Sequence, residues 1–122
     1  MRPINSMRCF SSEATSSTIF KEVEQQITSA PVVVFSKTYC PYCAEVLDLL
    51  KDIDPPAKVI QLDQEDYGVW RQDALEDITD QRTVPNIFIE GRHIGGCDDL
   101  HTGIKSGEVQ KKLDAANIKH NF

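Results

Sequence analysis

Residues 32–43 read VVVFSKTYCPYC, and this stretch decides the fold. Val32 to Phe35 form a continuous apolar run rich in β-branched side chains, which is typical of a strand buried on both faces. A short polar loop then leads to Cys40-Pro41-Tyr42-Cys43, and the apolar side chains of residues 44–50 recur at helical spacing. The stretch therefore predicts a buried strand, a loop, and a helix that begins at the cysteine pair.

Further strands are indicated on the carboxyl-terminal side of this stretch. Residues 59–62 form a second apolar strand, and the helix predicted between the two strands implies that they run parallel. Residues 86–89 and 92–94 flank Glu90-Gly91, which is a hairpin signal. The sheet is therefore predicted to be mixed, with a parallel pair and an antiparallel pair.

Five segments show the apolar spacing of amphipathic helices. They are residues 19–27, 44–50, 69–78, 98–104 and 109–113. Strands that alternate with helices define an α/β protein. No repeat or second domain is visible, so residues 17–122 are predicted to form a single domain.

The first sixteen residues, MRPINSMRCFSSEATS, differ from the rest of the chain. They lack apolar periodicity, are rich in serine, and carry Arg2 and Arg8 before any acid. Such a segment is either a disordered tail or an organellar transit peptide, and Arg8-Cys9-Phe10-Ser11 resembles a mitochondrial processing site. With a transit peptide in residues 1–11 the expected location is mitochondrial, and otherwise it is cytoplasmic. Cys9 has no assigned role.

Composition excludes several classes of partner. The net charge of -6 argues against nucleic acid, because phosphate binding needs a concentrated basic face. No window is apolar enough for a membrane span. The 4 cysteines are too few and too unevenly spaced for the disulfide framework of a secreted domain, so a reducing compartment is expected.

Cys40 lies where a helix amino terminus can stabilise a thiolate. A free thiol is mostly protonated near neutral pH, whereas unpaired N–H groups and the partial positive charge at the start of a helix favour its ionised form. Pro41 takes the first helical position, where its missing N–H costs nothing, and Lys37 adds a positive charge. Cys40 is thus predicted to be the nucleophile of thiol–disulfide exchange, and Cys43, one turn further on, the resolving thiol.

The cysteine pair also raises two metal-binding alternatives. A structural zinc site normally needs a second pair of ligands, and Cys97, His93 and His101 are the residues that could complete one. His93 is expected in a strand and His101 in a helix, which disfavours that site. An iron–sulfur cluster would more naturally be shared by two chains, and Pro41 stiffens the turn. No metal ligand is therefore predicted.

Three motifs together resemble the dithiol glutaredoxin family. They are KTYCPYC at residues 37–43, TVP at residues 83–85 and GGCDDL at residues 95–100. The resemblance covers about residues 17–116, and the order and spacing of the motifs make it specific. It implies a thioredoxin-like fold, with a central four-stranded mixed sheet flanked by about five helices, and a cis Pro85 that faces the cysteines. A trans proline that merely ends a loop is the alternative.

The resemblance also implies a binding site for glutathione, which would act as co-substrate. In it, Lys37, Gln72 and Arg82 hold the glycyl carboxylate, Tyr42 and Thr83 line the groove near the sulfur, and the Val84 backbone pairs with the cysteinyl unit.

At the other end of the glutathione site, Gly95-Gly96 allows a tight turn. The amides of Cys97, Asp98 and Asp99 then receive the γ-glutamyl carboxylate, while an Asp carboxylate takes the ammonium. The alternative for the two Asp residues is that they only cap this helix. Cys97 itself is either a structural or regulatory cysteine or a third redox thiol.

The leading hypothesis is a glutathione-dependent thiol–disulfide oxidoreductase that reduces protein–glutathione mixed disulfides and protein disulfides. The expected partners are glutathione and such proteins, with no nucleic acid and no membrane, and the chain is expected to be a monomer. An iron–sulfur carrier and a thioredoxin-like reductase served by a flavoenzyme are the competing hypotheses.

Overall fold

The computed structural model describes the backbone of residues 8–122 and the side chains from Thr15 onward. Within this part the chain forms five helices and four strands. In order they are α1 (Arg8–Ile27), β1 (Val32–Ser36), α2 (Pro41–Ile53), β2 (Ala57–Gln61), α3 (Gly68–Thr79), β3 (Asn86–Ile89), β4 (Arg92–Gly95), α4 (Cys97–Ser106) and α5 (Glu108–Ala115). The predicted α/β class and mixed four-stranded sheet are confirmed.

The sheet has the strand order β2-β1-β3-β4. β1 pairs in parallel with β2, with Val32 opposite Ala57, and antiparallel with β3, with Val32 opposite Ile89. β3 and β4 form the predicted antiparallel hairpin around Glu90-Gly91. Every residue of β1 is buried, as the continuous apolar run predicted, because β1 is a central strand covered on both faces.

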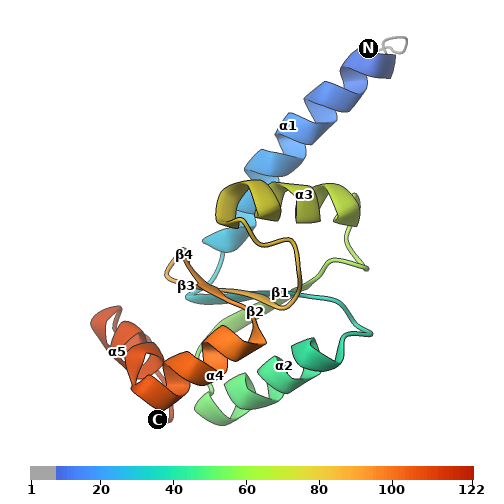
Figure 1. Ribbon diagram of the computed structural model, residues 1–122. Helices are drawn as coiled ribbons and strands as arrows, with labels where there is room; N and C mark the ends of the chain where they lie inside the picture. The colour runs from blue at the N-terminus through green and yellow to red at the C-terminus, as the bar shows by residue number, and fades with distance from the viewer. Residues whose placement is uncertain (1–7) are drawn as a thin grey trace.

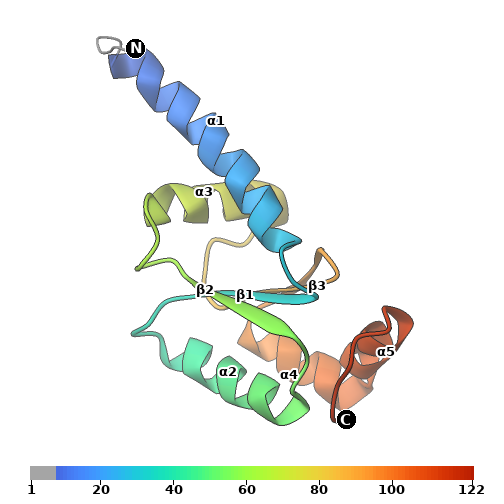
Figure 2. The same ribbon diagram turned by 180° about the vertical axis from the view of Figure 1, so that it is seen from behind.

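Two helical layers enclose the sheet (Figure 1). α1 and α3 lie on one face, and α2, α4 and α5 lie on the other, as the reverse view in Figure 2 also shows. Because side chains alternate along a strand, Val33 and Phe35 pack into the α1–α3 core, whereas Val32 and Val34 pack into the α2–α4–α5 core. One strand thus contributes side chains to both hydrophobic cores. Because β1 is held between them, the short loop that follows it places the start of α2 at its carboxyl end.

The first helix begins at Arg8 and so extends beyond the segment 19–27 in which the apolar spacing predicted it. Apolar spacing marks only the part of a helix that packs, and from Thr15 onward the buried residues of α1 are indeed Ile19, Val23 and Ile27. The amino-terminal turns continue beyond the rest of the molecule in Figure 1. Residues 1–7 and the side chain of Cys9 lie outside the described residues, so a tail or transit peptide in this segment stays a prediction. Across residues 8–122, no helix, α1 included, is both long and apolar enough to cross a bilayer.

Candidate active site

Cys40 caps the amino terminus of α2. Its backbone is extended, with φ -93° and ψ 116°, and its carbonyl accepts a hydrogen bond from the Ala44 N–H at 3.1 Å. Its sulfur accepts a hydrogen bond from the Cys43 N–H at 3.2 Å. Pro41 follows at the first helical position, as predicted. The sulfur therefore occupies the place where helix amides and the helix dipole favour a negative charge.

Cys43 is the enclosed member of the pair, at 1% exposure, whereas Cys40 is half-buried. Burial and the neighbouring Cys40 thiol raise the pKa of Cys43, although hydrogen bonds from Ser36 and the Lys37 backbone oppose the shift. Cys40, Cys43 and Cys97 are free thiols. The two thiols thus differ in access: the outer one is open to a substrate sulfur, whereas the inner one is enclosed and has a raised pKa.

The segment before β3 lies against Cys40. The Val84–Pro85 peptide bond is cis, as predicted, and the Val84 carbonyl lies 3.9 Å from the Cys40 sulfur. Among the hydrogen bonds of the described residues, none uses the Val84 N–H. Val84 therefore presents a backbone donor and a backbone acceptor beside the reactive sulfur.

A pair of residues that the sequence did not predict holds the loop before Cys40. The Thr38 N–H donates to Asp63 Oδ1 at 3.0 Å, and the Thr38 hydroxyl donates to Asp63 Oδ2. The hydroxyl bond holds the pKa of Asp63 below its usual range, so the carboxylate stays ionised. Asp63 follows β2, and it thereby ties the β2–α3 connection to the β1–α2 loop.

Two of the predicted carboxylate-binding residues, Gln72 and Arg82, lie together. The Gln72 amide donates to the Arg82 carbonyl at 3.1 Å, and the Arg82 guanidinium forms ion pairs with Asp73 and, at 3.8 Å, with Glu76. The Asp73 carboxylate is the main cause that raises the pKa of Arg82. Arg82 is therefore shared with acids of α3, and a bound carboxylate has to compete with them.

The remaining groove residues are accessible. Tyr42 is 64% exposed, Thr83 is exposed, and Lys37 is half-buried, with its Nζ 6.0 Å from the centre of the Tyr39 ring. The Lys37 carbonyl accepts a hydrogen bond from the Cys40 N–H at 3.2 Å, so the lysine belongs to the turn that carries the cysteine. All three can contact a ligand without rearrangement of the core.

The turn into α4 needs glycine at position 95. Gly95 has φ +125°, and an added Cβ would lie 2.2 Å from Asp99 Oδ2. That oxygen accepts a hydrogen bond from the Gly96 N–H at 3.0 Å. The capping alternative thus holds for Asp99, whose carboxylate is already used, while Asp98 stays exposed at the helix amino terminus.

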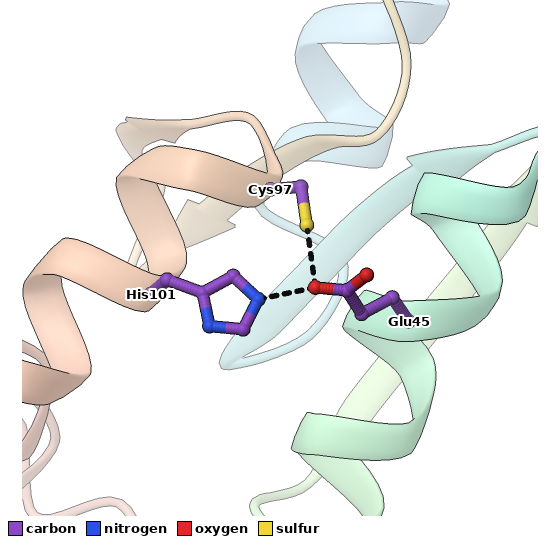
Figure 3. Close-up of side chains that lie close together, drawn as sticks. All are labelled: Glu45, Cys97 and His101. Atoms are coloured by element: carbon purple, nitrogen blue, oxygen red, sulfur yellow. Dashed lines mark hydrogen bonds and ion pairs between the residues drawn. The ribbon is translucent and has the colours of Figure 1, made fainter.

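Three polar side chains from α2 and from the first turns of α4 lie close together (Figure 3). Glu45 Oε2 forms a hydrogen bond with His101 Nε2, and the Cys97 sulfur donates to the same oxygen at 3.5 Å. The His101 bond lowers the pKa of Glu45, whereas burial and then Glu45 raise the pKa of Cys97 to about 11. His93 does not join this group, because it lies in β4 and its Nε2 contacts Asn86 Oδ1 at 2.8 Å.

The comparisons with known proteins all match this chain to glutaredoxins. The glutaredoxin family model matches residues 32–94. The chloroplastic glutaredoxin-C4 of Oryza sativa is 48% identical over 95 residues, which are 78% of this chain and 71% of that protein. Glutaredoxin-1 of Rhizophagus irregularis is 42% identical over 99 residues, which are 81% of this chain and 98% of that one. The crystal structure of a buckwheat glutaredoxin–glutathione complex superposes with a TM-score of 0.82 at 41% identity, over 86% of this chain and 96% of that one.

These matches and the fold define a thioredoxin-like oxidoreductase domain that carries a Cys-x-x-Cys dithiol. The chain belongs to the glutaredoxin family. It is a thiol–disulfide oxidoreductase of the glutathione-dependent class, which is the enzyme class predicted from its three motifs.

Proposed function

We propose that this chain reduces mixed disulfides between proteins and glutathione, and also protein disulfides, with Cys40 as the nucleophile and Cys43 as the resolving thiol. The observation that carries the proposal is the asymmetry of the pair. The Cys40 sulfur is accessible and accepts a helix N–H at 3.2 Å, whereas Cys43 is buried and its pKa is raised. The thiolate is the attacking species, so Cys40 acts first.

In the first step the Cys40 thiolate attacks the glutathionyl sulfur of the mixed disulfide. A new sulfur–sulfur bond joins Cys40 to glutathione, the old disulfide breaks, and the substrate protein leaves as a thiolate that takes a proton from water. A second glutathione thiolate then attacks the glutathionyl sulfur on Cys40. This step yields glutathione disulfide and restores the Cys40 thiolate. One half of the glutathione disulfide comes from the substrate, and the other half is the second glutathione.

Cys43 provides a second way to resolve the mixed disulfide on Cys40. Its sulfur lies within hydrogen-bonding reach of Cys40, and once deprotonated it displaces the bound partner and forms the Cys40–Cys43 disulfide. Because its pKa is raised, Cys43 is seldom a thiolate near neutral pH, and glutathione competes well for the intermediate. Reduction of a protein disulfide depends more on this intramolecular step.

Glutathione would bind across the site from Val84 to α4. The free Val84 N–H and the carbonyl 3.9 Å from Cys40 suit the backbone of the cysteinyl unit. The first amides of α4 and the exposed Asp98 suit the γ-glutamyl carboxylate and ammonium. The glycyl carboxylate would meet Lys37 and Arg82, with Gln72 holding the Arg82 backbone in place. The buckwheat glutaredoxin solved with glutathione supports this ligand.

A coupled assay tests the proposal. It follows glutathione-dependent reduction of a small glutathione mixed disulfide and of a protein disulfide. Cys40→Ser is expected to abolish both activities, while Cys43→Ser keeps the first and loses most of the second. Cys9→Ser is the matched control and is expected to leave both unchanged. Activity retained by Cys40→Ser would overturn the mechanism, and efficient turnover with thioredoxin reductase but not with glutathione would favour the competing reductase hypothesis.

The proposal includes a monomeric protein without an iron–sulfur cluster. The stiff turn at Pro41 and the reductase geometry of Cys40 and Cys43 support this assignment. Protein purified without oxygen is expected to be colourless and monomeric in size-exclusion chromatography. A brown dimer that holds glutathione would instead show that the chain carries a cluster.

The location of the chain is a separate proposal. The arginines, serines and missing acids of residues 1–11 support mitochondrial import, and without import the chain would stay in the cytoplasm. Residues 1–16 fused to a fluorescent protein are expected to direct it to mitochondria. The matched control replaces Arg2 and Arg8 by Gln, and equal distribution of the two fusions would reject the transit peptide.

A further inference from the structure

Glu45, Cys97 and His101 bring a carboxylate, a thiol and an imidazole to one point between α2 and α4 (Figure 3). Cys97 and His101 are one turn apart on the same face of α4, and Glu45 reaches them from α2. The three ligand atoms lie within 4.8 Å of one another. Neither cysteine of the active-site pair belongs to this cluster, and the proposed reaction uses none of the three side chains, although the Cys97 backbone amide lies in the proposed glutathione site.

We propose that Glu45, Cys97 and His101 bind a Zn²⁺ ion, with solvent in the fourth coordination position. Thiolate, imidazole and carboxylate are the three side-chain ligands that zinc takes in proteins, and three protein ligands plus water is the usual open site. The zinc alternative in the sequence combined Cys40 and Cys43 with Cys97, His93 and His101, and the expected strand position of His93 and helix position of His101 disfavoured it. The cluster seen here instead includes Glu45, which lies far from Cys97 in the chain.

The spacing of the cluster suits this ion. Bond lengths of about 2.3 Å to sulfur and about 2.0 Å to nitrogen and oxygen place tetrahedral ligand atoms roughly 3.3 to 3.6 Å apart. The Cys97 sulfur and Glu45 Oε2 are already 3.5 Å apart. The Glu45–His101 pair has to open slightly, and both side chains are about half exposed, so they have room to turn.

Charge and access also fit. With Cys97 as a thiolate and Glu45 ionised, the two negative charges balance Zn²⁺, and the neutral His101 imidazole completes the set. Binding replaces the Cys97 sulfur–hydrogen bond by a sulfur–zinc bond and releases that proton to solvent. A surface hollow lined by Asp98, His101, Thr102 and Lys105 adjoins the cluster, which leaves room for the fourth ligand.

Cobalt binding to the full-length chain tests the site directly. The host carries Cys9→Ser, Cys40→Ser and Cys43→Ser, so that Cys97 is the only thiol and the active-site pair cannot bind the ion. Titration with Co²⁺ is expected to give a thiolate-to-cobalt charge-transfer band with one equivalent bound, and Zn²⁺ is expected to displace the cobalt. Because the readout needs no catalysis, failure here leaves the proposed function standing.

Variants in the same host separate a built site from incidental binding. Cys97→Ser is expected to remove the charge-transfer band, and His101→Gln and Glu45→Gln are each expected to weaken Co²⁺ binding by at least about tenfold. His120→Gln is the matched control, because His120 contacts Asp114 but, among the described residues, belongs to no cluster that contains a thiol. Circular dichroism checks that each variant is folded. If Cys97→Ser does not fold, the variants at the exposed positions 45 and 101 still test whether the cluster binds the ion. No band in the host, or equal binding by His101→Gln and Glu45→Gln, would overturn the proposal.

Discussion

The guanidinium of Arg71 donates a hydrogen bond to the carboxylate of Glu22 over 2.7 Å, and this ion pair ties α3 to α1. Arg71 is buried, at 6% exposure, and it also donates to the Asp66 carbonyl at 2.8 Å and to the Gln26 side chain at 3.1 Å. One side chain on α3 thus satisfies acceptors from α1 and from the connection between β2 and α3.

Replacement of Arg71 by Ala is expected to lower the free energy of unfolding by about 2 to 3 kcal/mol, because it leaves partly buried acceptors without a donor. Glu22→Gln is expected to cost less, since its partner keeps the other acceptors. Lys111→Ala removes one member of an exposed pair with Glu108 and is expected to change stability by less than about 0.5 kcal/mol. Urea unfolding measures all three, and equal losses at positions 71 and 111 would contradict the assignment.

Reaction of the reduced chain with iodoacetamide is expected to distinguish the described thiols. At pH 7 with a metal chelator present, Cys40 is expected to be labelled first, because it is accessible and accepts the Cys43 N–H. Cys97 has a pKa of about 11, so roughly one molecule in ten thousand carries its thiolate at pH 7. Burial raises the pKa of Cys43 and protects it in the same way.

Peptide mapping by mass spectrometry locates the label. Protein unfolded in urea is the control, and there all cysteines are expected to react at similar rates. Labelling of Cys97 as fast as Cys40 in the folded chain would contradict the prediction.

The local patterns of the sequence were sufficient for the sheet and for the cysteine pair. The run from Val32 to Phe35 is long and apolar enough to identify a central strand, and Pro41 identifies where α2 begins. Both features depend on residues adjacent in the chain. The cis Pro85, by contrast, was predicted only from the resemblance of residues 83–85 to a known motif.

Contacts between distant parts of the chain could not be predicted in the same way. Thr38 and Asp63, like Arg71 and Glu22, are ordinary surface residue types in one sequence, and only the packed fold brings them together. The ion pairs of Arg82 with α3 are of this kind too, and they change its availability to a ligand. Arginine is usually exposed to solvent, so the residue type alone could not predict that Arg71 is buried.

Stability is expected to fall with acid through His93. His93 keeps an exposed side, but its ring packs against Phe88 at 5.3 Å between centroids, and the partial loss of solvent there lowers the pKa of His93, although Asp99 acts in the opposite direction. The unfolded chain binds a proton at this residue below a pH of about 6.5, where the folded chain still resists it. Unfolding therefore becomes more favourable as the pH falls from about 6.5 toward the lowered pKa of His93 in the folded chain.

Urea unfolding between about pH 5 and pH 8 measures this slope. His93→Gln cannot take up the proton but keeps a side-chain donor for Asn86, so it is expected to lose this part of the pH dependence. His120→Gln is the control for a half-buried histidine that contacts an exposed aspartate, Asp114. An unchanged slope in His93→Gln would show that other groups cause the acid sensitivity.

Gly95→Ala is expected to weaken glutathione binding by misplacing the start of α4. The new Cβ would lie 2.2 Å from Asp99 Oδ2 in a backbone with φ +125°, so Asp99 must move and the Gly96 N–H loses its acceptor. Loss of such a cap costs about 1 kcal/mol of stability, and a loss of about the same size in binding to the misplaced α4 amides would raise the KM for glutathione about fivefold. Gly107→Ala, at the far end of α4, also has a positive φ, but nothing lies within 4 Å of the added Cβ.

The control is therefore expected to lose about 1 kcal/mol of stability with KM unchanged. A double-mutant cycle with Asp99→Ala then locates the cause. If Gly95→Ala acts on binding through the Asp99 carboxylate, it is expected to add little to the KM of the Asp99→Ala variant, although backbone strain still lowers stability. Additive effects of the two substitutions on KM would show that Gly95 shapes the glutathione site by a route other than the Asp99 cap.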